Sequence, residues 1–126
     1  MGQQGKHLNS IKVSHEKHTA GCATEIMAIP ETVCISMSQH IGAPCKPLVK
    51  KGDQVKVGQL IGDTDAFVSA PIHSSVSGTV KEISTIRSVT GGDDQVVIIE
   101  TDGNQDVYEE IKPPVINDMK DFIAAV

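Results

Sequence analysis

Histidine and cysteine side chains near the N-terminus are the first candidates for chemistry, because both residue types bind metals. His15 and His18 stand three residues apart, and His18 precedes Cys22 by four, so one helix face would present them together. The H-E-x-H pattern is one residue shorter than the H-E-x-x-H helix of zinc enzymes, and Gly21 weakens a helix between His18 and Cys22. We therefore interpret this segment as polar and solvated, and predict no metal site in it.

The cysteines do not form a recognisable framework. Cys22, Cys34 and Cys45 are an odd set without a C-x-x-C pair. A disulfide scaffold, a zinc site or an iron–sulfur cluster would need a different number or spacing. We predict buried or free thiols in a reducing compartment.

Catalytic motifs are absent from the rest of the sequence. His40 has no carboxylate, serine or second histidine at a useful spacing, so we favour a structural or interface role for it over that of a ligand or base. Gly52 and Gly58 do not form a phosphate loop, because no lysine follows Gly58. Six aspartates fit no calcium motif, and we predict that they serve turns: Asp63, Asp65, Asp93, Asp94, Asp102 and Asp106. No catalytic, cofactor-binding or metal residue is therefore predicted in this chain.

Composition limits the classes of partner. Only 2% of the residues are aromatic and the net charge is -5, whereas single-stranded nucleic acids need stacking platforms and a basic groove. No apolar run approaches the roughly 20 residues of a membrane-spanning helix, and nothing at the N-terminus resembles a signal peptide. We expect an intracellular protein with no nucleic-acid partner and no direct membrane insertion.

The elements that must position any functional residue are read from a degenerate repeat between Ser38 and Ile83. After Ala43-Pro44 come Val49, Gly52 and Val55, and after Ala70-Pro71 come Val76, Gly78 and Val80. Both copies mix valines with turn glycines at strand-like spacing, which predicts two β units related by an approximate two-fold axis.

Strands are predicted on both sides of this repeat and within it. From Thr32 to Ser38 the chain alternates, with Val33, Ile35 and Met37 on one face. Leu48-Val49 and Leu60-Ile61 begin short strands, Gly91 to Asp94 forms a hairpin turn, and Gln95 to Glu100 is a strand buried on both faces. Apolar residues from Val115 to Val126 follow a helical period.

Within the repeat, one run resembles the barrel-sandwich hybrid of biotinyl and lipoyl carrier domains. The resemblance rests on Val49 to Ile61, followed by Ser69-Ala70-Pro71 and Ser77 to Val80. In those carriers, the hairpin between the two halves presents a lysine that receives the prosthetic group. Here the hairpin from Gly62 to Val68 contains no lysine, so the resemblance implies the carrier fold without the carrier chemistry.

A more specific resemblance covers about Lys17 to Asp102. The sequence S-Q-H-I-G-A-P from Ser38 to Pro44, and then Gly52-Asp53, Phe67 to Pro71 and His73-Ser74, look like the N-terminal domain of the C subunit of the Rnf electron-transport complex. Members of that family belong to membrane assemblies that move electrons between ferredoxin and NAD, coupled to ion translocation. The resemblance implies FMN, NAD(H) and 4Fe–4S clusters in regions that follow this domain, and none within it. It also implies contact with the rest of the polypeptide and other Rnf subunits, at the cytoplasmic face of the membrane.

We therefore predict an all-β barrel-sandwich hybrid with a short N-terminal extension and a truncated C-terminal helix. Residues 1–16 are expected to form a flexible leader, for which a native origin and a partial expression-vector remnant both stay open. Residues 17–112 form the domain, and residues 113–126 form a linker and the start of a helix that belongs to a following domain. We expect no catalytic activity from this chain; its parent would be part of an ion-translocating ferredoxin:NAD oxidoreductase.

The predicted function is a non-catalytic structural or docking module, and two loops are the candidate contacts. These residues are Ser38, Gln39, His40, Ile41, Gly42, Ala43 and Pro44 in the first loop, and Asp65, Ala66 and Phe67 at the hairpin tip. Phe67 is interpreted either as an exposed anchor or as a core-filling side chain. Two alternatives stay open: a biotinyl or lipoyl carrier domain, and a free-standing protein-binding module.

Overall fold

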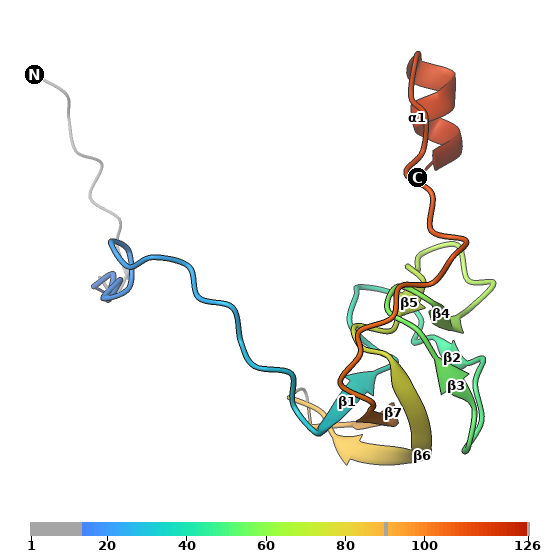
Figure 1. Ribbon diagram of the computed structural model, residues 1–126. Coiled ribbons are helices and arrows are strands. Elements are labelled where there is room, and N and C mark those ends of the chain that lie inside the picture. Colours follow the sequence, from blue (N-terminus) through green and yellow to red (C-terminus); the bar gives the residue numbers. More distant parts are fainter. Residues whose placement is uncertain (1–13, 90, 126) are drawn as a thin grey trace, which may run out of the picture.

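The computed structural model describes residues 14–89 and 91–125, in which seven strands precede one helix (Figure 1). The elements are β1 (Thr32–Ser36), β2 (Lys46–Pro47), β3 (Gln54–Val55), β4 (Leu60–Asp63), β5 (Ile72–His73), β6 (Gly78–Arg87), β7 (Asp93–Thr101) and α1 (Met119–Ala125). The prediction of an all-β domain with a short C-terminal helix is confirmed.

The larger sheet has the strand order β1-β7-β6-β3, with every neighbouring pair antiparallel. Its alternation places Ile35 and Met37 in the core and Val33 against it, as the sequence predicted. Val96 and Val97 on β7 are both fully buried although they point to opposite faces, so this central strand is covered on both sides. In Figure 1, β6 curves strongly as it crosses the barrel, and its pairing with β7 shifts register between Val80 and Glu82.

The smaller sheet has the order β2-β4-β5 and closes the other side of the core. Equivalent valines of the two repeat units, Val49 with Val76 and Val55 with Val80, are all buried in one apolar cluster. The repeated valine spacing therefore marks core positions.

Three local predictions need correction. The first short strand is Lys46–Pro47 rather than Leu48-Val49, and Leu48 is 56% exposed. Pro47 is tolerated because β2 lies at the edge of its sheet, where a missing backbone donor costs little. Asp93 and Asp94 belong to β7 and not to the preceding turn, and Asp93 forms an ion pair with Arg87 at 3.7 Å.

The third correction concerns the helix. It begins at Met119 and not at Val115, because the Asp118 carboxylate accepts hydrogen bonds from the backbone N–H groups of Lys120 (2.8 Å) and Asp121 (2.9 Å) and so caps its N-terminus. No residue of α1 is buried.

A strap, defined as residues 105–111, follows the barrel and crosses its turn at residues 56–58. Val57 donates to the Asp106 carbonyl (2.8 Å), Tyr108 donates to the Val57 carbonyl (2.9 Å), and Val57 and Val107 form a parallel bridge. The strap is therefore joined to the barrel by one parallel bridge.

Residues 14–29 contain neither helix nor strand, and in Figure 1 this segment runs away from the two sheets. Nowhere in residues 14–89 and 91–125 does a helix reach the length and apolarity that a bilayer crossing requires.

Candidate contact surface

The first predicted contact segment, Ser38–Pro44, leaves the end of β1 as a tight loop. Ser38 donates its backbone N–H to the Ser36 hydroxyl oxygen (3.0 Å), and the His40 Nε2 atom hydrogen-bonds the Ala43 carbonyl (3.1 Å) across the loop. His40 is half-buried and is bonded within its own loop, and its structural or interface role stays a prediction. The side chain of Ile41 is left 91% exposed.

The second predicted segment lies in the connection between β4 and β5. The Asp63 carboxylate accepts the Thr64 N–H (2.8 Å), and the Ser69 hydroxyl donates to the Ala66 carbonyl (2.7 Å). These bonds within the connection define its course and leave the Phe67 ring fully exposed. The alternative of a core-filling Phe67 is thereby wrong.

The structure brings these two segments together. Ala43 donates its N–H to the Val68 carbonyl (3.2 Å), and the Cys45 thiol donates to the Ala70 carbonyl (3.2 Å). Gly42 has a φ of 118°, and a Cβ atom there would lie only 2.0 Å from the Val68 oxygen. A glycine is therefore required where the two loops meet.

A third segment, the turn between β6 and β7, completes this end of the molecule. It shares a hollow of about 360 Å³ with the first loop, lined by Ser38, Gln39, His40, Ile41, Ser88, Val89 and Asp94. The Val89 side chain is fully exposed. Sequence reasoning missed Val68, Val89 and Asp94, because no local pattern indicates which loops will meet. We call the union of Ser38–Pro44, Asp65–Val68, Ser88–Val89 and Asp94 the contact surface.

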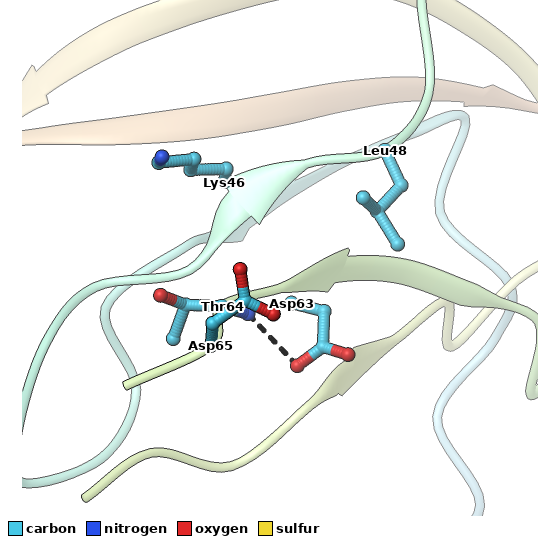
Figure 2. Close-up of a pocket in the computed structure, with 5 residues that line it drawn as sticks. All are labelled: Lys46, Leu48, Asp63, Thr64 and Asp65. Carbon is cyan, nitrogen blue, oxygen red and sulfur yellow. Dashed lines mark hydrogen bonds between the residues drawn. The ribbon is translucent and has the colours of Figure 1, made fainter. Parts of the chain in front are cut away.

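A second hollow, of about 230 Å³, lies beside the hairpin tip (Figure 2). Its lining residues are Lys46, Leu48, Asp63, Thr64 and Asp65. Figure 2 shows the Leu48 side chain pointing toward β4. Asp63 is the last residue of β4, and Asp65 lies in the loop that follows. The nearby Cys45 thiol is buried, and burial together with the Asp63 charge raises its pKa. A protonated thiol is a poor nucleophile, so Cys45 lacks the lowered pKa of a catalytic cysteine.

The other sequence candidates do not assemble into a site. His18 contacts the Glu16 carboxylate at 3.0 Å, and both side chains are exposed. Cys22 and Cys34 are exposed free thiols, and Cys45 is a buried one, as predicted. Among the residues that the structure describes, no group of three or more histidine, cysteine, aspartate or glutamate side chains could hold a metal ion.

Comparison with known proteins decides the family. Residues 6–104 match the family described as the RnfC barrel sandwich hybrid domain. This chain belongs to that family. The barrel-sandwich fold and the resemblance to the C subunit of the Rnf complex, both predicted from the sequence, are confirmed.

Curated relatives of this RnfC domain are C subunits of redox complexes. The C subunit of the proton-translocating ferredoxin:NAD(+) oxidoreductase complex of Clostridium ljungdahlii is 48% identical over 96 residues, which are 76% of this chain and 21% of the relative. The C subunit of the Na(+)-translocating ferredoxin:NAD(+) oxidoreductase complex of Acetobacterium woodii is 49% identical over 84 residues, which are 67% of this chain and 19% of the relative. The C subunit of the ion-translocating oxidoreductase complex of Methanosarcina acetivorans is 39% identical over 79 residues, 61% of this chain and 18% of the relative.

The RnfC domain thus spans about a fifth of the length of the relatives it matches. It is almost equally similar to a relative named for proton translocation and to one named for Na(+) translocation. The similarity of this domain therefore does not indicate a coupling ion.

Proposed function

We propose that this RnfC domain is a non-catalytic docking module of the C subunit in a ferredoxin:NAD oxidoreductase complex. The contact surface binds the remainder of the same polypeptide or other subunits of the complex. The observation that carries this proposal is the fully exposed Phe67 ring on a loop that is bonded to the Ser38–Pro44 loop. Exposed aromatic side chains on a well-ordered support are typical energetic centres of protein interfaces.

The chemistry of electron transfer is assigned to the part of the C subunit outside this chain. FMN, NAD(H) and 4Fe–4S clusters would be bound there. For the clusters, this agrees with the described residues, in which the three cysteines belong to no group that could hold a metal ion. Through the complex, the domain would lie at the cytoplasmic face of the membrane. The carrier alternative has no support from the tip, because residues 64–71 contain no lysine to carry a prosthetic group.

Replacing Phe67 by serine in the full-length C subunit tests the docking function. The isolated domain should keep its free energy of unfolding, because the ring makes no buried contact. Loss of an interface anchor typically costs about 2 kcal/mol or more, or roughly a thirtyfold weaker association, so the variant protein should co-purify poorly with its complex or transfer electrons slowly.

Val107 on the strap is the matched control for this substitution. Its side chain is 60% exposed and lies outside the contact surface, so Val107→Ser should leave assembly and ferredoxin-dependent NAD reduction unchanged. Normal assembly and normal electron transfer in the Phe67→Ser protein would rule out docking through this loop.

A further inference from the structure

The charge pattern around the contact surface indicates what kind of partner it fits. Ile41, Phe67 and Val89 are each at least 91% exposed, and Val68 is 54% exposed. Such apolar loop tips occur on two kinds of protein: those that insert into the surface of a membrane, and those that enter a pocket of another protein.

The charges around the loops distinguish a membrane surface from a protein pocket as the partner. The described parts of the three loops, residues 38–44, 64–71, 88–89 and 91–92, contain no lysine or arginine. Asp65 precedes Phe67 by two residues in the same loop, and Asp94 lines the hollow together with Ile41 and Val89. Two basic groups border the loops: Lys46 lines the hollow beside Asp65, and Arg87 is paired with Asp93. An anionic lipid surface attracts basic residues and repels carboxylates, so this surface is unsuited to it.

The hollow next to Ile41 is suited to a cation. Asp94 is the one carboxylate in its lining, and Ser38, Gln39 and His40 supply further polar atoms. Asp94 is half-buried, and in the described residues its carboxylate takes part in no hydrogen bond or ion pair. A lysine or arginine side chain that enters this hollow would gain a partner in a partly desolvated place, where charge-assisted hydrogen bonds are strongest.

We propose that the contact surface binds a protein whose matching face has an apolar pocket for Phe67 and, beside it, a lysine or arginine that enters the Asp94 hollow. This proposal rests on the docking function and adds the chemistry of the partner. The apolar tips supply the buried centre of the interface, and the carboxylates select a basic border.

Site-specific photo-crosslinking in the assembled complex tests the proposal. Benzoylphenylalanine replaces Phe67 in the full-length C subunit, and the crosslinked product is identified by mass spectrometry. We expect a protein crosslink, and we expect Asp94→Lys to lower its yield about tenfold at low salt, with a smaller effect in 0.5 M NaCl. Asp94→Asn should give an intermediate yield, because it removes the charge without reversing it.

Two controls keep the outcomes distinct. Glu82→Lys reverses a charge in the same way as Asp94→Lys, but on the exposed part of β6, and it should leave the crosslink yield unchanged. Sedimentation of the chain with vesicles of three parts phosphatidylcholine to one part phosphatidylglycerol should show no binding.

Each alternative result has a definite meaning. A protein crosslink that Asp94→Lys does not weaken would overturn the basic-border chemistry and leave docking intact. A lipid adduct at position 67, together with vesicle binding that Phe67→Ser abolishes, would overturn both proposals in favour of a membrane contact. A crosslink yield at position 67 no higher than at the exposed strap residue Val107 would also overturn the proposed interface.

Discussion

Gly42 shows how one residue without a side chain holds the contact surface together. Gly42→Ala should destabilise the domain for two separate reasons. The φ of 118° strains a residue with a side chain, and a Cβ at this position would lie only 2.0 Å from the Val68 oxygen. We expect a loss of about 2–3 kcal/mol in the free energy of unfolding, measured by urea denaturation, and faster hydrogen exchange of the Ala43 amide.

Gly52 is the matched control for this prediction. It also has a positive φ, 93°, but open space surrounds the position where a Cβ would stand. Gly52→Ala should therefore cost only about 1 kcal/mol, from backbone strain alone. Equal losses in the two variants would show that the contact with Val68 does not constrain position 42.

Asp102 makes the stability of the domain depend on pH in the acid range. The Ser77 hydroxyl, followed by the Asn104 N–H, donates to its carboxylate and lowers the pKa of Asp102 below the ordinary value of 3.8. The folded-state pKa lies below the unfolded-state value, so the stabilisation is fully present above 3.8. It is lost as the pH falls through the folded-state pKa.

We therefore expect the native chain and Asp102→Asn to differ in their free energy of unfolding at neutral pH. The two values should converge under strongly acidic conditions. Ser77→Ala should move the pKa of Asp102, followed by carboxyl-carbon NMR, back toward its ordinary value. An unchanged pKa in that variant would contradict the role of the Ser77 hydroxyl.

At the scale of elements, the strap is held by an ion pair, backbone bonds and a packing contact. Lys56 pairs with Glu109, which raises the pKa of Lys56 and lowers that of Glu109. The Ile111 side chain covers Gly58, and a Cβ added at position 58 would lie 2.1 Å from the Cδ1 atom of Ile111. The strap therefore fixes the path of the chain after the barrel.

Lys56→Met and Glu109→Gln should each speed hydrogen exchange of the Tyr108 amide, which donates to Val57. The double variant should exchange little faster than either single one, because both lose the same interaction. High salt screens the ion pair, so it should partly speed the hydrogen exchange of the Tyr108 amide in the native chain. Arg87→Gln removes the distant pair with Asp93 and serves as the control; if it accelerates Tyr108 exchange equally, the effect is not specific to the strap.

At the scale of the whole molecule, the barrel and the C-terminal helix contribute unequally to stability. No residue of α1 is buried, and Val115, Ile116, Met119, Phe122 and Ile123 all remain exposed. Removing residues 113–126 should leave the free energy of unfolding unchanged within about 0.5 kcal/mol and should reduce binding of a hydrophobic dye.

A longer deletion provides the comparison. Removal of residues 105–126 also takes away the strap with its backbone bonds to Val57 and the Ile111 contact, and should cost about 2 kcal/mol or more. If the shorter deletion destabilises the domain as much, then α1 contributes contacts to the barrel.

Much of the fold was predictable because it depends on local order in the chain. Alternation from Thr32 to Ser38 identified β1, and the apolar run from Gln95 identified β7. The valines of the repeat, which predicted β units, lie in the core. These patterns work because a strand turns alternate residues to opposite faces and a core accepts only apolar ones. Strand boundaries were less predictable, since hydrogen bonds to distant partners determine where pairing begins.

The sequence by itself determined the family, through the motif from Ser38 to Pro44, and the lack of carrier chemistry, through a tip without lysine. Only the tertiary structure decided that this motif lies against Val68, that Phe67 is exposed, and that Asp94 faces the same hollow as His40. Those relations join residues about 25 to 55 positions apart. Local periodicity specifies which face of a strand is buried, but the packing of two sheets around a shared core decides which loops meet at its end.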